Sequence, residues 1–259
     1  MGVLEAPAWL VPAFVRNVVG AGATASPDEI RTVAERLLDR WLSPGRNFHN
    51  VKHLVEVLVR VDELDEESHE PDLVRLAAWY HGAVFDSAER KAYANKGGED
   101  EAASARLAFD DLVGLGVPEH NAQRVHDLVT ALVRHAPNPK DPDCAVLCDA
   151  DLAMLASEPQ RYKAYLQDVR AEYSHVPAAD YARARARILR KLLARPSLFS
   201  TPLGAGWEEP ARQNVEAELQ RLEKEIAKHD AEAAAHALVA PDPVEDAVPA
   251  APRDGSATP

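Results

Sequence analysis

Three histidines lie in segments whose composition suggests a metal site. The segment NFHNVKHL places His49 and His53 four residues apart, on one face of a helix or at its start. The segment WYHGAVFD places His81 at the end of an apolar helical pattern. A single histidine in a helix is most often a hydrogen-bonded structural residue. Two at this spacing, followed by a third in an apolar segment, favour a site where imidazoles from separate helices converge.

Aspartates accompany these histidines in apolar surroundings. Asp86 follows His81 by five residues, and the segment CDADLAML places Asp149 and Asp151 inside an otherwise apolar helix. A buried carboxylate without a partner is strongly unfavourable, so each needs a cation or hydrogen-bond donors. Asp149 and Asp151 lie about 200° apart around a helix, so we expect only one of them to face a given metal. Imidazoles and carboxylates together are the donors that a hard or borderline divalent cation requires.

The order of these motifs resembles the HD-domain superfamily of metal-dependent phosphohydrolases. The chain carries F-H-N-x-x-H, then W-Y-H-x-A-V-F-D, then T-x4-H at Thr130 and His135, and then D-A-D-L-A. The likeness covers roughly Arg46 to Arg212, because YARARARILRKLLARPSLFST and EEPARQN also look like the C-terminal helices of the predicted-hydrolase branch. The resemblance implies an all-α fold of the HD-domain or phosphodiesterase-like type.

The resemblance also implies a role for each residue of the site. In the relatives, the second histidine of the first pair binds metal and the first donates a proton. Carried over to this chain, these roles fall on His49 as the proton donor and on three metal ligands: His53, His81 and Asp151. Asp149 stays open as the alternative to Asp151, and His135 is a further candidate for the site.

The chain departs from the family at the dyad for which the family is named. The relatives have an aspartate directly after the histidine of the second motif, whereas this chain has Gly82. We expect Asp86 to supply the missing carboxylate, with Glu101 at the start of the next predicted helix as a further candidate. One relocated carboxylate is poorly placed to bridge two ions, so we expect a single cation, and Gly82→Asp should then raise metal affinity. The dipeptide His126-Asp127 is an alternative dyad, although it lacks the surrounding W-Y-H-x-A-V-F-D motif.

The motifs are compatible with several cations and phosphate ligands. A site rich in histidine suits Mn, Fe, Co, Ni or Zn, and one with fewer imidazoles suits Mg or Mn. Three arginines near the motifs are candidates for holding a phosphate group: Arg46, Arg185 and Arg195. Most surface arginines are only salt-bridge partners, so this role requires that the side chain face the site.

Helical patterns account for most of the chain around these motifs. Ser26-Pro27-Asp28-Glu29 is a capping box, and proline or glycine bounds each later pattern. The predicted helices span about 27–41, 50–64, 71 into the second motif, 99–115, 118–135, 143–156, 159–173, 178–194 and 208–238. No segment alternates with a period of two, so the prediction is all-α. The polar segment SAERKAYANKGG is predicted to be a loop at the mouth of the site.

Composition limits the organisation and the partners of the chain. The 259 residues suit an N-terminal packing arm (1–25), one HD-like helical domain (26–238) and an acidic, proline- and alanine-rich tail (239–259) that we expect to be disordered. The net charge of −13 argues against a nucleic-acid polymer as partner. The apolar start has neither the basic region of a signal peptide nor an unbroken membrane span. With only two cysteines, Cys144 and Cys148, the cytoplasm is the expected location.

Taken together, the motifs predict a metal-dependent phosphohydrolase. Its substrate would be a nucleotide or another small phosphorylated molecule, and its cofactor a single divalent cation. The alternative is a non-catalytic HD-like ligand-binding or regulatory protein that lost its metal together with the aspartate. A third interpretation is a helical scaffold in which the histidines are structural.

Overall fold

The helices of the structure follow the capping and breaking residues of the sequence. The computed structural model describes residues 5–86 and 98–239, except for the side chains of 236–239. Within these residues the chain forms α-helices and short 3-10 helices, and its only extended pairing is one bridge between Phe85 and Glu99. The predicted all-α fold is confirmed. The elements are α1 (Leu10–Gly20), α2 (Pro27–Trp41), α3 (Val51–Glu63), η1 (Asp65–Glu67), α4 (Pro71–Tyr80), α5 (Glu101–Gly114), α6 (Glu119–Ala131), α7 (Pro142–Leu152), η2 (Ala153–Ala156), α8 (Pro159–Glu172), α9 (Ala178–Leu193), η3 (Leu203–Trp207) and α10 (Glu208–Val239).

Side-chain caps set the start of α2 and α3. At α2, the Glu29 carboxylate accepts a hydrogen bond from Ser26 N at 2.8 Å and the Ser26 hydroxyl accepts one from Glu29 N, which completes the predicted capping box. At α3, the Asn50 side chain accepts a hydrogen bond from Lys52 N at 2.8 Å. Each cap satisfies a backbone donor that the first turn leaves without a partner. The cap at Asn50 places His53 in the first turn of α3.

The segment 1–25, predicted as a packing arm, contains a helix that belongs to the core. Pro12 lies in the first turn of α1, where a backbone N–H would have no helical partner, so the helix tolerates it. Phe14 is fully buried, and its ring centroid lies 4.9 Å from that of Trp79 in α4. Residues 1–4 of the predicted arm lie outside the described residues.

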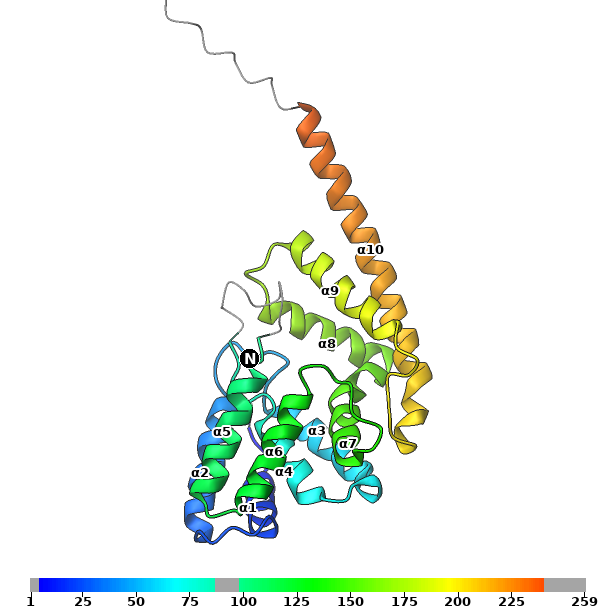
Figure 1. Ribbon diagram of the computed structural model, residues 1–259. Helices are drawn as coiled ribbons and strands as arrows, with labels where there is room; N and C mark the ends of the chain where they lie inside the picture. Colours follow the sequence, from blue (N-terminus) through cyan, green and yellow to red (C-terminus); the bar gives the residue numbers. More distant parts are fainter. Residues whose placement is uncertain (1–4, 87–97, 240–259) are drawn as a thin grey trace, which may run out of the picture.

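Helix α4 lies at the centre of the larger part of the molecule. It contacts α1, α3, α5, α6 and α7, which surround it in the lower half of Figure 1. Its last turn, with Ala77, Trp79 and Tyr80, is fully buried. Because His81 follows this turn directly, the central position of α4 delivers that histidine to the interior.

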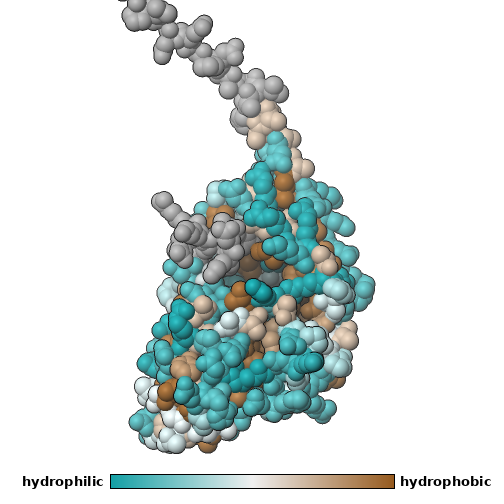
Figure 2. Space-filling model, viewed as in Figure 1, coloured by the Kyte–Doolittle hydropathy of each residue, from teal (hydrophilic) through white to brown (hydrophobic). Residues whose placement is uncertain are grey.

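The remaining helices form a second layer next to this body. Helices α8, α9 and α10 share an apolar cluster that includes Tyr162, Leu189 and Val215, and α10 runs along α9 and extends beyond it (Figure 1). The face drawn in Figure 2 is mostly hydrophilic, with small hydrophobic patches. Among the described helices, none has both the length and the apolar character needed to cross a membrane. The predicted loop SAERKAYANKGG, apart from its last glycine, and the predicted tail from Ala240 onward lie outside the described residues.

Candidate metal centre

Three side chains predicted as ligands converge in the structure. His53 comes from the first turn of α3, His81 follows α4, and Asp151 lies near the end of α7. The two Nε2 atoms are 3.2 Å apart, and Asp151 Oδ1 lies 3.2 Å from Nε2 of His53 and 3.7 Å from Nε2 of His81. Both histidines are buried, and the aspartate side chain is 14% exposed. The donors therefore form a nearly dry triangle.

The size of this triangle suits a single transition-metal ion. Bonds of about 2.1 Å place neighbouring ligands roughly 3.0 Å apart in an octahedral site and roughly 3.4 Å apart in a tetrahedral one. The observed separations of 3.2, 3.2 and 3.7 Å lie close to this range. An ion held by three protein donors would keep further coordination positions for water or substrate, as catalytic zinc sites do and closed structural sites do not.

Hydrogen bonds and burial put His81 and Asp151 in the protonation states that bind a cation. His81 Nδ1 lies 2.6 Å from the carbonyl oxygen of Ala78, to which it donates, so its Nε2 carries the free lone pair. Burial lowers the pKa of His81 and keeps the ring neutral. Burial alone would raise the pKa of Asp151, but hydrogen bonds with His135 and His53 hold it well below its usual range. The aspartate is therefore a carboxylate near neutral pH.

His135 contacts the carboxylate of Asp151 from outside the triangle. Its Nε2 lies 2.6 Å from Asp151 Oδ2. The helix predicted to reach residue 135 ends at Ala131, and His135 has a left-handed backbone with φ of 43°. Arg195 donates hydrogen bonds to the carbonyl oxygens of His135 and Arg134, at 2.6 and 2.7 Å, which holds the unwound turn. Backbone strain of this kind is concentrated at functional sites, and here it orients the ring toward a ligand.

Asp149, the alternative ligand, points away from the triangle. Its carboxylate accepts hydrogen bonds from Ser200 N, Thr201 N and the Thr201 hydroxyl at 2.7–2.9 Å. Burial raises its pKa despite these hydrogen bonds. Asp149 thus anchors the segment between α9 and η3, whereas Asp151 faces the histidines, as the angle of about 200° between two such helical positions requires.

The space beside Gly82 is filled by a tryptophan. A Cβ atom added at Gly82 would lie 2.6 Å from Cη2 of Trp41. Trp41 is fully buried, its Nε1 donates to the Trp79 carbonyl at 3.0 Å, and its ring lies 5.2 Å from that of His81. The glycine is therefore explained by close packing of an indole ring against the turn that carries His81. An aspartate at this position would clash with Trp41 unless the indole moved.

The carboxylate predicted to replace the missing aspartate is not part of the triangle. After the His81 turn the chain becomes extended, and Asp86 N donates to Gly98 O at 2.7 Å beside the Phe85–Glu99 bridge. This path leaves Asp86 exposed, and Glu101 begins α5 outside the triangle. The same bridge brings Glu99 toward the site, with Oε2 3.9 Å from Nε2 of His49. Glu99 follows a glycine-rich polar segment, and no sequence signal marked it.

His49 is held next to the triangle by a glutamate that the motifs did not reveal. The fully buried Glu172 carboxylate accepts hydrogen bonds from Phe48 N and His49 N, both at 2.8 Å, and lies 2.7 Å from His49 Nδ1. Burial lowers the pKa of His49, but Glu99 and Glu172 together raise it to about 9. Burial likewise opposes ionisation of Glu172, yet His49 lowers the pKa of this carboxyl. The pair is thus charged near neutral pH, with Nε2 of His49 directed away from Glu172.

A cavity of about 520 Å³ gives access to these side chains from one side. It touches His49, His53 and Asp151 of the site, and it is lined further by Phe48, Glu99, Val133, Arg134, His135, Leu152, Met154, Leu155, Tyr165, Arg185, Ile188, Lys191, Leu192 and Arg195. Four of these are basic and one, Glu99, is a carboxylate, so the cavity favours anions. The volume is within the range of small-molecule sites.

The three arginines predicted to hold phosphate have different surroundings. Arg46 is buried and donates to the carbonyl oxygens of His49, Gly82 and Ala83, so it ties the two histidine segments together and does not line the cavity. Arg185 lines the cavity, but its guanidinium is bonded to Glu218 and to the Tyr165 hydroxyl. Arg195 lines the cavity and donates only to backbone carbonyls in the described hydrogen bonds, so its charge is not neutralised by a carboxylate. Of the three, Arg195 has the surroundings best suited to an anion.

The alternative dyad lies away from the site. His126 and Asp127 are on α6, where His126 Nδ1 and Asp127 Oδ1 are 3.0 Å apart and the Asp127 side chain is 59% exposed. Their exposure fits a surface pair of the helix. It leaves His53, His81 and Asp151 as the metal-type cluster of the described residues.

Comparisons with known proteins add no further assignment. The chain matches no protein-family model, no curated protein and no solved structure.

Proposed function

We propose that this protein is a metal-dependent phosphohydrolase of the HD-domain type, acting on a nucleotide or another small phosphate ester. The observation that carries the proposal is the triangle of His53, His81 and Asp151, whose donor atoms all lie within 4.8 Å of one another. Its three members are the ligands that the motif resemblance nominates. Two imidazoles and one carboxylate favour Mn, Fe, Co, Ni or Zn over Mg.

Each group of the site has a place in hydrolysis. A divalent cation held by the triangle would acidify a coordinated water and polarise the phosphoryl oxygen. His49 is charged near neutral pH, and Glu172 occupies its Nδ1, so the Nε2 proton is available for the leaving oxygen. Glu172 fixes the orientation of that ring, as a hydrogen-bonded carboxylate does for many catalytic histidines.

The cavity offers binding surfaces for both parts of a phosphate ester. Arg134 and Lys191 are exposed at its wall, and no described carboxylate forms an ion pair with either. Together with Arg195 they supply positive charge for phosphate oxygens. Phe48, Ile188 and Leu192 supply apolar surface for the organic group. This division favours an ester with a sizeable apolar part, such as a nucleoside, over inorganic polyphosphate.

The second candidate is a ligand-binding protein of the same fold without catalysis. It is favoured by one observation: Trp41 occupies the space beside Gly82 that an aspartate would need, so the site has one carboxylate fewer than the motif resemblance implies. In this case the basic cavity would bind a phosphorylated ligand and leave it unchanged.

Metal content and turnover separate the two candidates. The natural protein, purified without a histidine tag, is expected to contain about one metal ion per chain and to hydrolyse some members of a panel of nucleotides and phosphate monoesters. His53→Ala and Asp151→Ala should each lose the metal and the activity while circular dichroism stays helical. Asp149→Asn is the matched control, because this carboxylate belongs to the same helix but faces Thr201. Ligand-induced thermal stabilisation without turnover would favour the second candidate. Absence of metal in the natural protein would contradict the metal-centre proposal.

A further inference from the structure

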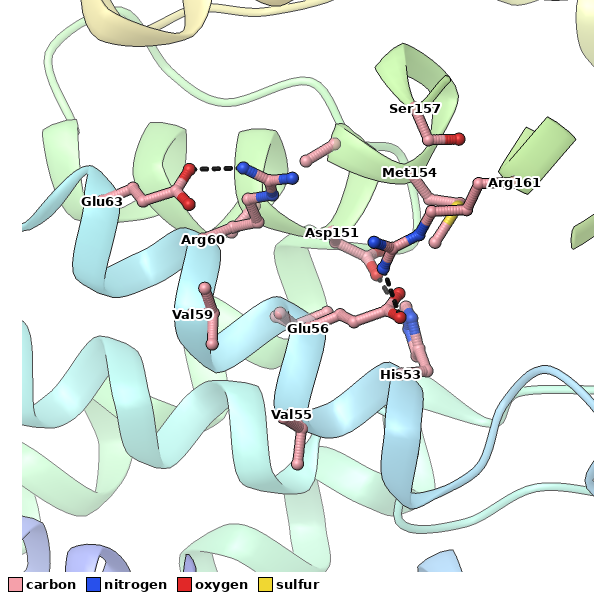
Figure 3. Close-up of a pocket in the computed structure, with 13 residues that line it drawn as sticks. His53, Val55, Glu56, Val59, Arg60, Glu63, Asp151, Met154, Ser157 and Arg161 are labelled. Carbon is pink, nitrogen blue, oxygen red and sulfur yellow. Dashed lines mark hydrogen bonds and ion pairs between the residues drawn. The ribbon is translucent and has the colours of Figure 1, made fainter. Parts of the chain in front are cut away.

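A second, smaller cavity reaches the triangle from another side. It has a volume of about 190 Å³ and lies between α3 and the segment formed by the end of α7, η2 and the start of α8 (Figure 3). His53, Asp151 and Met154 line both cavities. Two of the three triangle residues, His53 and Asp151, thus line both cavities.

The sizes of the two cavities suit different molecules. A water molecule takes about 30 Å³, so the smaller cavity holds roughly six waters, about the volume of a hydrated cation. Small-molecule sites usually measure about 300–1,000 Å³. The larger cavity, at about 520 Å³, falls in this range, and the smaller one, at about 190 Å³, does not. The smaller cavity is therefore below the usual size for an organic phosphate but large enough for a hydrated ion.

The charges that line the cavities also suit a cation in the smaller cavity and an anion in the larger one. The smaller cavity has three carboxylates, on Glu56, Glu63 and Asp151, and two guanidinium groups, on Arg60 and Arg161. The larger one has four basic residues and two carboxylates. A cation thus experiences a more favourable potential in the smaller cavity, and an anion in the larger one.

An ion pair joins two of the residues that line the smaller cavity. Glu56 lies one turn after His53 on α3 and pairs with Arg161 of α8, as Figure 3 shows. Their side chains are 34% and 51% exposed, so the ion pair is weak and can open readily. Ser157 also lines this cavity.

We propose that the smaller cavity is the route by which the divalent cation reaches and leaves the triangle, with the Glu56–Arg161 ion pair as its gate. The inference rests on the proposed metal centre and extends it. The phosphorylated substrate uses the larger cavity, so the cation can exchange while that cavity is occupied. Arg161 repels an approaching cation when it is unpaired, so the gate also limits the exchange rate.

The kinetics of metal exchange test this route without any activity measurement. Metal-free protein is mixed with Zn²⁺ in a stopped-flow instrument, and loaded protein is mixed with an excess of a chromogenic chelator. Arg161→Ala should raise both rate constants about fivefold, the effect of losing a gate worth about 1 kcal/mol, and leave the dissociation constant within about twofold. Glu56→Gln removes a carboxylate of this route and leaves Arg161 unpaired, so it should slow the uptake of Zn²⁺. Val59→Trp should slow both steps, because Val59 is 44% exposed on the cavity wall and a larger ring there fills the cavity.

Matched controls distinguish the two routes. Lys191→Ala, in the larger cavity, should leave both rates unchanged, and saturating inorganic phosphate should leave the release rate within about twofold. Slower release with phosphate, together with natural rates in Arg161→Ala and Glu56→Gln, would place the route in the larger cavity and overturn the inference. Metal exchange as described, without hydrolysis of any ester, would contradict only the phosphohydrolase proposal. A natural protein that binds no Zn²⁺ would overturn both.

Discussion

Replacing Gly82 by alanine tests whether the packing of Trp41 determines the turn that carries His81. The added Cβ would lie 2.6, 3.1 and 3.3 Å from Cη2, Cζ3 and Cζ2 of the indole, all closer than the ordinary contact of 3.4–4 Å. The ring must move by roughly 1 Å to restore that contact. It has little freedom to move, because it is fully buried and its Nε1 donates to the Trp79 carbonyl at 3.0 Å.

The expected cost follows from two opposing effects. Overpacking of a well-packed core costs about 1–3 kcal/mol. Replacing glycine by alanine restricts the unfolded chain, which contributes about 0.4–1 kcal/mol of stability. The free energy of unfolding should therefore fall by about 1–2 kcal/mol, or by about 2–8 °C in melting temperature for a chain of this size. Gly82→Asp should lower it at least as much and should not raise the metal content.

Urea and thermal denaturation followed by circular dichroism measure this change. Gly114→Ala at the end of α5 is the matched control, because an added Cβ there meets no atom within 4 Å, and its stability should be equal or higher. In a Trp41→Leu background the clash is removed, so Gly82→Ala should cost less than it does alone. An equal cost in both backgrounds, or a Gly82→Ala variant as stable as the natural protein, would refute the packing explanation.

The remaining predictions concern the side chains around the site and the tail. Asp149→Ala should lower the free energy of unfolding by about 2–4 kcal/mol in urea denaturation, because it leaves buried donors of the Ser200–Thr201 segment without an acceptor. The Asp149→Ala variant should keep the metal, whereas Asp151→Ala should lose it. Glu172→Gln should retain the metal in elemental analysis and lower turnover about tenfold or more, since His49 loses the carboxylate that orients it. In metal-free protein, the melting temperature should decrease as the pH rises from 6.5 through about 9, because folding raises the pKa of His49 and the charged ring stabilises the folded state. Folding lowers the pKa of Glu172, so its carboxylate stabilises the folded state above pH 4.5, and this stabilisation is lost on acidification. Glu172→Gln should flatten both limbs, and an unchanged profile would show that the pair does not couple to folding. Truncation after Val239 should leave the melting temperature unchanged, because the proline-rich acidic tail has little apolar surface with which to pack.

Local sequence signals determined the helices and most of the ligand set. The capping box at Ser26 and the apolar stripes have short-range causes, so they predict where helices run within a few residues. The motifs nominated His53, His81 and Asp151, which the structure brings together. The angle between neighbouring positions on a helix also limited the Asp149–Asp151 pair to one ligand, although it could not decide which one.

Only the tertiary structure decided which other side chains reach the site. Glu172 contacts His49 across 123 residues of sequence, and Glu99 is brought to the site by its backbone pairing with Phe85. Neither contact has a local signal in the sequence. The role of Gly82 was likewise invisible, because the atom it accommodates belongs to Trp41, in a different helix. Arg46 has the charge needed to bind phosphate, but its guanidinium donates to backbone carbonyl oxygens of the same protein. Residue type determines what a side chain can bind, but its partners depend on the packing of helices that are far apart in the chain.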